Sequence, residues 1–123
     1  MELYKLGEME QKFADIIWAN EPVSSRALTE ICEKEFAWKR TTTYTMLRRL
    51  CDRKIFENKN GTVTALMSKN EFGAAQGEQF LSDAFSGSLP QFLAAFTRRK
   101  KLNSIEVDEI QRLINEYKED SHD

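Results

Sequence analysis

The segment from residue 40 to residue 68 constrains the fold most, because a short helical pattern runs directly into a β-hairpin signal. Between about residues 40 and 53, small and apolar residues at three- and four-residue spacing predict a helix with one buried face, formed by Thr43, Met46, Leu47 and Leu50. The following IFENKNGTVTALMS predicts two short strands around Asn60-Gly61, the dipeptide most typical of two-residue hairpin turns. Whatever precedes this helix must therefore pack on its buried face and beside the hairpin.

Two further helices are predicted before this segment. The first spans about residues 7–20, where the apolar residues with helical spacing are Leu6, Met9, Phe13, Ile16 and Ile17. Pro22 then interrupts the chain, and Ser24 is a natural N-cap for a second helix over about residues 25–34. The connection EFAW carries two aromatic side chains that we expect to pack into the core. Three helices followed by a hairpin form a winged helix-turn-helix, so we predict a mainly α fold with a small β-hairpin wing.

The remaining part of the chain, residues 70–123, is predicted to form three more helices. Ser88 and Pro90 start the middle one, and Asn103 with Glu106 forms a capping box for the last. A helical tail of about 50 residues cannot bury so many apolar faces by itself. We therefore expect this part to be a helical dimerisation region that contacts a second copy through Phe80, Leu81, Phe92, Leu93, Phe96, Val107, Ile110, Leu113, Ile114 and Tyr117.

The charge of the chain is distributed unevenly. Its 123 residues carry a net charge of −2 with a pI near 5.5, which argues against an indiscriminate binder of polyanions. The window 38–59 nevertheless holds seven basic residues against two acidic ones, Asp52 and Glu57. Positive charge is therefore concentrated at the predicted third helix and the hairpin.

Several classes of protein are not expected from this sequence. No apolar run is long enough to cross a bilayer and no secretory signal opens the chain, so we expect a cytoplasmic protein without membrane insertion. Cys32 and Cys51 fall on apolar faces, which favours buried reduced thiols over redox sensors. Catalytic motifs are absent, and the single histidine, His122, lies in a polar tail. We expect neither an enzyme nor a cofactor or metal.

The exposed side of the third predicted helix favours a role in binding DNA. It presents Thr41, Tyr44, Thr45 and Arg48, again at three- and four-residue spacing. A helix fits the major groove of B-DNA, where small hydroxyls approach base edges closely and exchange hydrogen bonds with them. Arg40 and Arg48 suit guanine edges or phosphates, whereas phosphates suit the remaining basic residues, which are Arg49, Arg53, Lys54 and, at the hairpin tip, Lys59. The alternative is that the threonines only start the helix and the basic side chains are solvated.

Several segments, taken in order, are similar to those of a known family. They are DIIW at the end of the first helix, WKRTTTYTMLRRL as the recognition helix, NG in the wing, and then SLPQFLAAF and LNSIEVDEIQRLI. Over almost its whole length the chain resembles the penicillinase-repressor family of bacterial transcriptional regulators. The resemblance implies a homodimeric repressor that binds a palindromic operator, and the positions that read DNA in relatives fall on Thr41, Thr42, Tyr44 and Thr45.

The resemblance also implies how repression could end. In penicillin-responsive members, a membrane-bound zinc peptidase triggers cleavage between an asparagine and a phenylalanine of the dimerisation region. Aligned from FTRRKKL, that bond falls between Ala95 and Phe96, so the phenylalanine is present and the asparagine is not. The alternative is that Phe96 is only a core residue. A second departure is Lys54, which stands where the family usually has glycine, and copper sensing is not expected because the C-terminal cysteine cluster of copper-sensing relatives is missing.

These observations together predict a two-part protein. Residues 1–69 are expected to form the winged-helix DNA-binding domain and residues 70–123 the dimerisation region. Two other functions use the same fold: a winged-helix module that binds a protein partner, and a regulator that senses a small ligand. The positive charge of the window 38–59 favours DNA over a protein partner.

Overall fold

The computed structural model describes residues 4–121, so that His122 lies outside the described part. Its elements in chain order are α1 (Glu8–Asn20), β1 (Val23–Ser24), α2 (Ser25–Phe36), α3 (Arg40–Asp52), β2 (Phe56–Lys59), β3 (Thr62–Ala65), α4 (Lys69–Phe85), α5 (Leu89–Arg99) and α6 (Ser104–Ser121). The chain divides into two compact units between Phe80 and Leu81, inside α4. The boundary expected at 69/70 corresponds to the start of this same helix.

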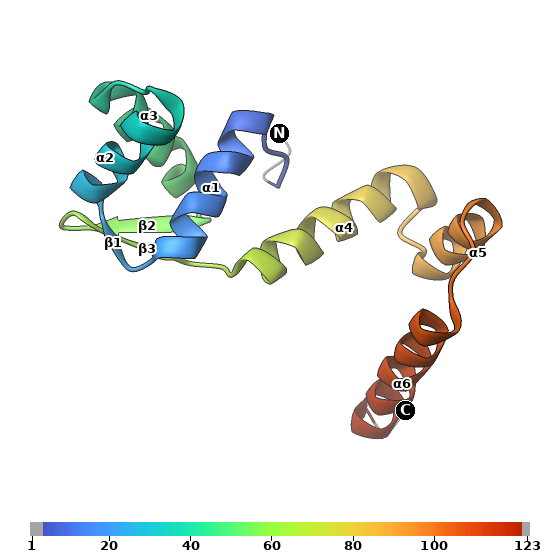
Figure 1. The fold of residues 1–123 in the computed structure, drawn as a ribbon. Helices are drawn as coiled ribbons and strands as arrows, with labels where there is room; N and C mark the ends of the chain where they lie inside the picture. Colours follow the sequence, from blue (N-terminus) through green and yellow to red (C-terminus); the bar gives the residue numbers. More distant parts are fainter. Residues whose placement is uncertain (1–3, 122–123) are drawn as a thin grey trace. The chain divides into compact units, whose positions relative to one another are not determined.

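The first unit is a winged helix-turn-helix, in which α1, α2 and α3 pack beside a small antiparallel sheet (Figure 1). The predicted mainly α fold and its hairpin wing are confirmed. The sheet has three strands in the order β1-β3-β2, rather than the two expected. The additional strand β1 pairs Val23 with Val63 and Ser24 with Thr62. Two residues are too few to show a strand period, so the sequence alone carried no signal for β1.

The core of this unit collects the apolar faces that the helical spacing had indicated. Its largest fully buried side chains come from helices and strands alike and include Phe13, Ile17, Leu28, Leu50, Ile55, Phe56, Val63 and Phe72. The second helix continues to Phe36, past the predicted end at residue 34. Phe36 and Trp38 are half-buried, with ring centroids 4.9 Å apart, and Trp38 lies 5.5 Å from the ring of Phe13. The two aromatics therefore pack against the core from its edge.

Three of the helices, α2, α5 and α6, begin at the polar residues that the sequence indicated. Ser24 Oγ accepts a hydrogen bond from the Ala27 amide at 3.0 Å, and Ser88 caps α5 in the same way. At α6 the capping box is complete, because Asn103 Oδ1 accepts from the Glu106 amide at 2.8 Å and Glu106 Oε1 accepts from the Asn103 amide at 3.2 Å. These bonds satisfy amide groups that the first turn of a helix leaves without partners.

The wing is held in shape by its own turn and by the start of α2. Asn60 and Gly61 have φ values of 51° and 86°, the left-handed geometry of a type I′ hairpin turn. Asn58 Oδ1 accepts a hydrogen bond from the Gly61 amide at 3.1 Å, which closes the turn. The Gly61 carbonyl in turn accepts from the Ser25 amide at 2.8 Å. The wing tip is therefore tied to the N-terminus of α2.

The end of α3 is a C-cap motif with an unusual residue at its left-handed position. The Ile55 amide donates to the Leu50 carbonyl at 3.2 Å and the Lys54 amide to the Cys51 carbonyl at 2.9 Å, the hydrogen-bond pattern of a Schellman motif. Lys54 has a φ of 63°, whereas this position favours glycine because a Cβ atom is crowded there. The departure from the family pattern thus falls where backbone strain is expected.

Replacing Lys54 with glycine is expected to stabilise the folded protein. Relief of the left-handed strain outweighs the larger entropy of the unfolded glycine chain, so the free energy of unfolding should rise by about 0.5–1 kcal/mol. Urea unfolding followed by circular dichroism measures the change. Lys54→Ala is the matched control, because it removes the same charge and keeps the strain. An equal gain from alanine would assign the effect to the charge.

The second unit contains α5 and α6 and exposes much of its apolar surface. No residue of α5 is buried, and none of α6 is buried up to Asp120. The rings of Phe85, Phe92 and Phe96 follow one another with centroid separations of 5.5 Å and 5.6 Å. The apolar stripe of α6 has Leu113 60 % exposed and Tyr117 74 % exposed, and consists of Val107, Ile110, Leu113, Ile114 and Tyr117. Of the helices described, none is long and apolar enough to cross a membrane.

Candidate nucleic-acid interface

The helix α3 divides its residues between the core and the surface as its periodicity predicted. Thr43, Leu47 and Leu50 are buried, and Met46 is half-buried. The opposite side, called the exposed face of α3 below, consists of Arg40, Thr41, Thr42, Tyr44, Thr45, Arg48 and Arg49. It is polar throughout, apart from the ring of Tyr44. The structure therefore brings seven of the nine expected DNA-binding residues onto one helical surface.

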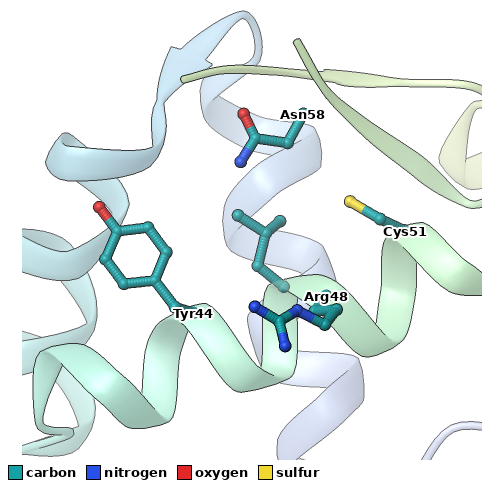
Figure 2. Close-up of a pocket in the computed structure, with 5 residues that line it drawn as sticks. Tyr44, Arg48, Cys51 and Asn58 are labelled. Carbon is teal, nitrogen blue, oxygen red and sulfur yellow. The ribbon is translucent and has the colours of Figure 1, made fainter. Parts of the chain in front are cut away.

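Two hollows flank this exposed face. The first has a volume of about 260 Å³ and is lined by Thr41, Thr42, Thr45, Met46 and Arg49. The second, also of about 260 Å³, lies between α3 and the wing strand β2 and is lined by Tyr44, Leu47, Arg48, Cys51 and Asn58 (Figure 2). The helix thus forms a ridge with a depression on either side, a relief that suits insertion into a groove.

The side chain of Thr45 is oriented by a hydrogen bond within α3. Its hydroxyl donates to the Thr41 carbonyl at 2.9 Å, one helical turn back. The hydroxyl proton is therefore used inside the helix, and the lone pairs of Oγ1 and the methyl group remain on the outside. In contact with a base edge, Thr45 would accept a hydrogen bond or pack on a thymine methyl group.

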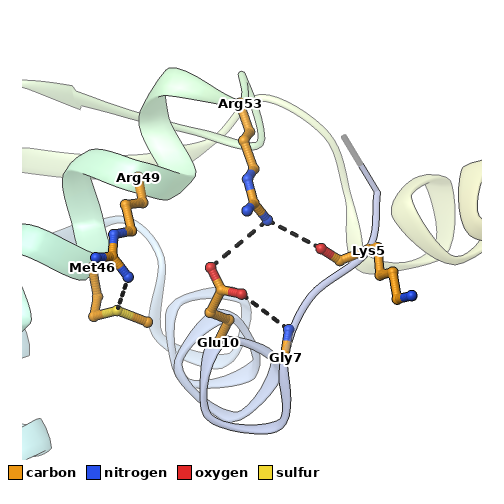
Figure 3. A network of polar contacts seen from close by, with 6 residues as sticks. All are labelled: Lys5, Gly7, Glu10, Met46, Arg49 and Arg53. Atoms are coloured by element: carbon orange, nitrogen blue, oxygen red, sulfur yellow. Dashed lines mark hydrogen bonds and ion pairs between the residues drawn. The ribbon is translucent and has the colours of Figure 1, made fainter. Parts of the chain in front are cut away.

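The basic residues near α3 differ in how far they are free to meet a ligand. Arg53 lies in a network with α1, in which its Nη1 donates to the Lys5 carbonyl at 3.1 Å and lies 3.7 Å from Glu10 Oε2 (Figure 3). Glu10 Oε1 also accepts from the Gly7 amide at 3.0 Å. The Arg53 side chain is only 23 % exposed. We therefore leave Arg53 out of the proposed DNA-binding set, because its guanidinium is already occupied within the protein.

Arg49 and Lys59 remain accessible. Arg49 is exposed on α3, and its Nη1 lies 3.7 Å from the Met46 sulfur, a weak contact that orients the side chain (Figure 3). Lys59 is 80 % exposed at the wing and lies 4.0 Å from Glu57, a surface ion pair that contributes little. Both cations can therefore turn toward a phosphate without breaking a strong bond.

Asn58 is a residue of this surface that the sequence reasoning did not single out. It lies on β2 opposite Val63, two residues before the turn, and it lines the hollow together with residues of α3 (Figure 2). The four residues FENK of β2 are too few to show which side chains face α3, so the sequence carried no signal for Asn58. Only the packing of the wing beside α3 brings Asn58 and Arg48 to the same hollow.

The two cysteines have thiols that resist ionisation. Burial raises the pKa of Cys32, and the neighbouring Thr43 hydroxyl opposes this only in part. Burial is also the main reason that the pKa of Cys51 is raised, and the negative charge of Asp52 adds to it. A protonated thiol is a poor nucleophile and a poor metal ligand. Among the residues that the structure describes, no three potential metal ligands cluster together.

A three-helix unit with a β-hairpin wing, whose third helix exposes a polar, arginine-bearing ridge, defines a winged-helix protein of the DNA-binding regulatory class. The comparison with protein families agrees, since the model of the penicillinase repressor family matches residues 6–116. The chain belongs to this family of transcriptional repressors, whose members are regulators and not enzymes. No curated protein matches the chain.

Proposed function

We propose that the protein is a homodimeric repressor, in which each protomer inserts α3 into the major groove of one half of a palindromic operator. The observation that carries this proposal is the exposed face of α3, a continuous polar ridge between two hollows. Base edges would be read by Thr41, Thr42, Tyr44 and Thr45. The phosphates on either side would be held by Arg40, Arg48, Arg49 and Lys59.

The dimer is supported by the surface of the second unit. Leu113 and Tyr117 are more than half exposed, and Val107 and Ile114 about half. An apolar stripe of this kind on a monomer favours association, because burial removes apolar area from water. A second copy offers the same stripe, so a two-fold contact would cover both at once. Phe80, Leu81, Phe92, Leu93 and Phe96 complete the proposed dimerisation set.

Two substitutions on α3 should separate contacts to the backbone from contacts to bases. Arg49→Ala should weaken binding to all sequences alike and make the salt dependence shallower, because a phosphate contact carries no sequence information. Tyr44→Ala should cost about 1–3 kcal/mol on the preferred sequence and relax the preference at particular base pairs. The measurement is a gel-shift titration on a duplex that the wild-type protein selects from a random-sequence pool, called the selected duplex, and on a scrambled duplex.

The comparison of the two variants decides the assignment of the helix positions. Arg49→Ala should keep the ratio of affinities for selected and scrambled DNA, and Tyr44→Ala should reduce it. If both variants change the two affinities by the same factors, Arg49 and Tyr44 do not have different roles. The unfolding midpoint of each variant serves as a control, because both side chains are exposed and surface substitutions alter stability by only about 0.5 kcal/mol.

Release of repression is proposed to follow cleavage at Ala95–Phe96, triggered by a membrane-bound zinc peptidase. This bond lies inside α5, and Phe96 packs on Phe92 at 5.6 Å. Proteases bind extended chain, so α5 would have to unfold locally before the cut. In the single chain no residue of α5 is buried, so the contacts that resist this unfolding would be those of the proposed dimer. The cut would separate α6 and its apolar stripe from the DNA-binding unit.

Mass spectrometry of the chain before and after induction in cells measures this cleavage. The expected result is a fragment ending at Ala95 that accumulates as the regulated genes are expressed. Full expression of the regulated genes with an intact 123-residue chain would exclude cleavage as the release mechanism and leave Phe96 as a packing residue.

A further inference from the structure

The hollow between α3 and β2 combines an apolar floor with polar groups at its rim (Figure 2). Leu47 is buried at its base and Cys51 is half-buried beside it, while the ring of Tyr44 forms one wall. Arg48 stands at the rim on the α3 side and Asn58 on the side of the wing. None of the five residues that line the hollow is acidic.

The orientation of the Asn58 amide follows from the wing turn. Its Oδ1 accepts the hydrogen bond from the Gly61 amide at 3.1 Å, and an N–H group requires an oxygen in that position. The Nδ2 group must therefore point away from the turn, toward the hollow (Figure 2). The position of Asn58 on the strand is set by its pairing with Val63 of β3. Two hydrogen-bond donors, a guanidinium and an amide, therefore border one depression.

The chemistry of the hollow matches a sugar–phosphate unit better than a base edge. A lining that offers two donors and holds no carboxylate suits phosphate oxygens, and an apolar floor suits the carbon face of a deoxyribose. The hollow lies on the wing side of α3, bordered by Tyr44 and Arg48 of its exposed face, where the DNA backbone would border the major groove. A base edge would instead face Thr41 and Thr45 on the ridge.

We propose that this hollow seats one sugar–phosphate unit of the DNA backbone, with Arg48 and the Asn58 amide as donors to the same phosphate. This inference rests on the proposed function and extends it. Asn58 becomes a DNA contact, and it shares one phosphate with Arg48. The pair would fix the distance between the recognition helix and the wing on the bound duplex.

Asn58→Asp tests the proposal without disturbing the wing. The aspartate retains an oxygen for the Gly61 amide and replaces Nδ2 with a negatively charged acceptor. Affinity for the selected duplex should fall at least about tenfold, because the new charge would face a phosphate. Asn70→Asp is the matched control, since it adds the same charge at an exposed position of α4 and should change affinity by less than about twofold. Equal losses in the two variants would overturn the proposal.

A scan with neutral methylphosphonate linkages locates the contact. Each phosphate of one half of the selected duplex is replaced in turn, and the affinities of wild type, Asn58→Asp and Arg48→Ala are compared. At one and the same linkage, both variants should bind as tightly as wild type. The reason is that removing the charge of a phosphate and altering a group that contacts it have effects that are not additive. If a variant binds more weakly than wild type at every linkage, the proposal is overturned. The scan gives this answer with Arg48→Ala alone if Asn58→Asp does not fold. Failure of the wild-type chain to bind any duplex at low salt would instead refute the proposed function.

Discussion

Leu113→Asp is expected to convert the proposed dimer into a monomer and to reduce the affinity of the protein for the selected duplex by about a thousandfold. Leu113 lies in the apolar stripe of α6 and is 60 % exposed in the single chain. In a two-fold interface the substitution would place two carboxylates in an apolar contact, and each would cost several kcal/mol unless it were paired. If the free energy of dimer association falls by about 4 kcal/mol, the dissociation constant of the dimer rises by a factor of about a thousand.

The loss of DNA binding would follow from mass action. A dimer holds two half-site contacts together, so that the second contact forms at a high effective concentration. Separate monomers would each bind one half-site weakly, as after cleavage in α5. Sedimentation at micromolar concentration measures the dimer, and a gel-shift titration measures binding.

The control for this experiment is Asn115→Asp on the same helix. Asn115 lies on the side of α6 opposite the stripe, where it is exposed and accepts a hydrogen bond from Gln111. The Asn115→Asp substitution introduces the same carboxylate and should leave the dimer intact. A Leu113→Asp chain that sediments as a dimer and binds the selected duplex like wild type would show that the stripe is not the dimer interface.

A second large effect is expected from salt. Each chain presents six exposed cations at α3 and the wing, which are Lys39, Arg40, Arg48, Arg49, Lys54 and Lys59. If a dimer neutralises six to ten phosphates with them, raising salt from about 50 to 200 mM should reduce affinity by about 10³–10⁵-fold, because condensed counterions are released on binding. A plot of log affinity against log salt concentration measures the number of contacts from its slope.

Two arginine variants make the salt experiment specific. Arg40→Gln should reduce the magnitude of the slope by about two per dimer, one for each lost phosphate contact. Arg53→Gln should leave the slope unchanged, because the Arg53 guanidinium binds Glu10 and the Lys5 carbonyl in the free protein. An affinity that does not depend on salt would refute binding through the phosphates, and a shallower slope for Arg53→Gln would return Arg53 to the DNA-binding set.

What the sequence determined was local. Ser24 and Asn103 cap their helices through bonds to residues three positions away, and Asn60-Gly61 closes the hairpin between adjacent strands. The division of α3 into a buried and an exposed face follows from helical period alone. Each of these features depends on residues that are close in the chain, so composition and spacing were enough to predict them.

What the tertiary structure decided depends on residues that are far apart in the chain. The strand β1 forms because Val23 pairs with Val63, and no two-residue segment forms a strand by itself. Arg53 is withdrawn from the proposed DNA surface by Lys5 and Glu10, more than 40 positions earlier. Asn58 borders the hollow because the wing packs beside α3. Such contacts form only when distant segments meet in the folded chain, and they leave no periodic signal in the sequence.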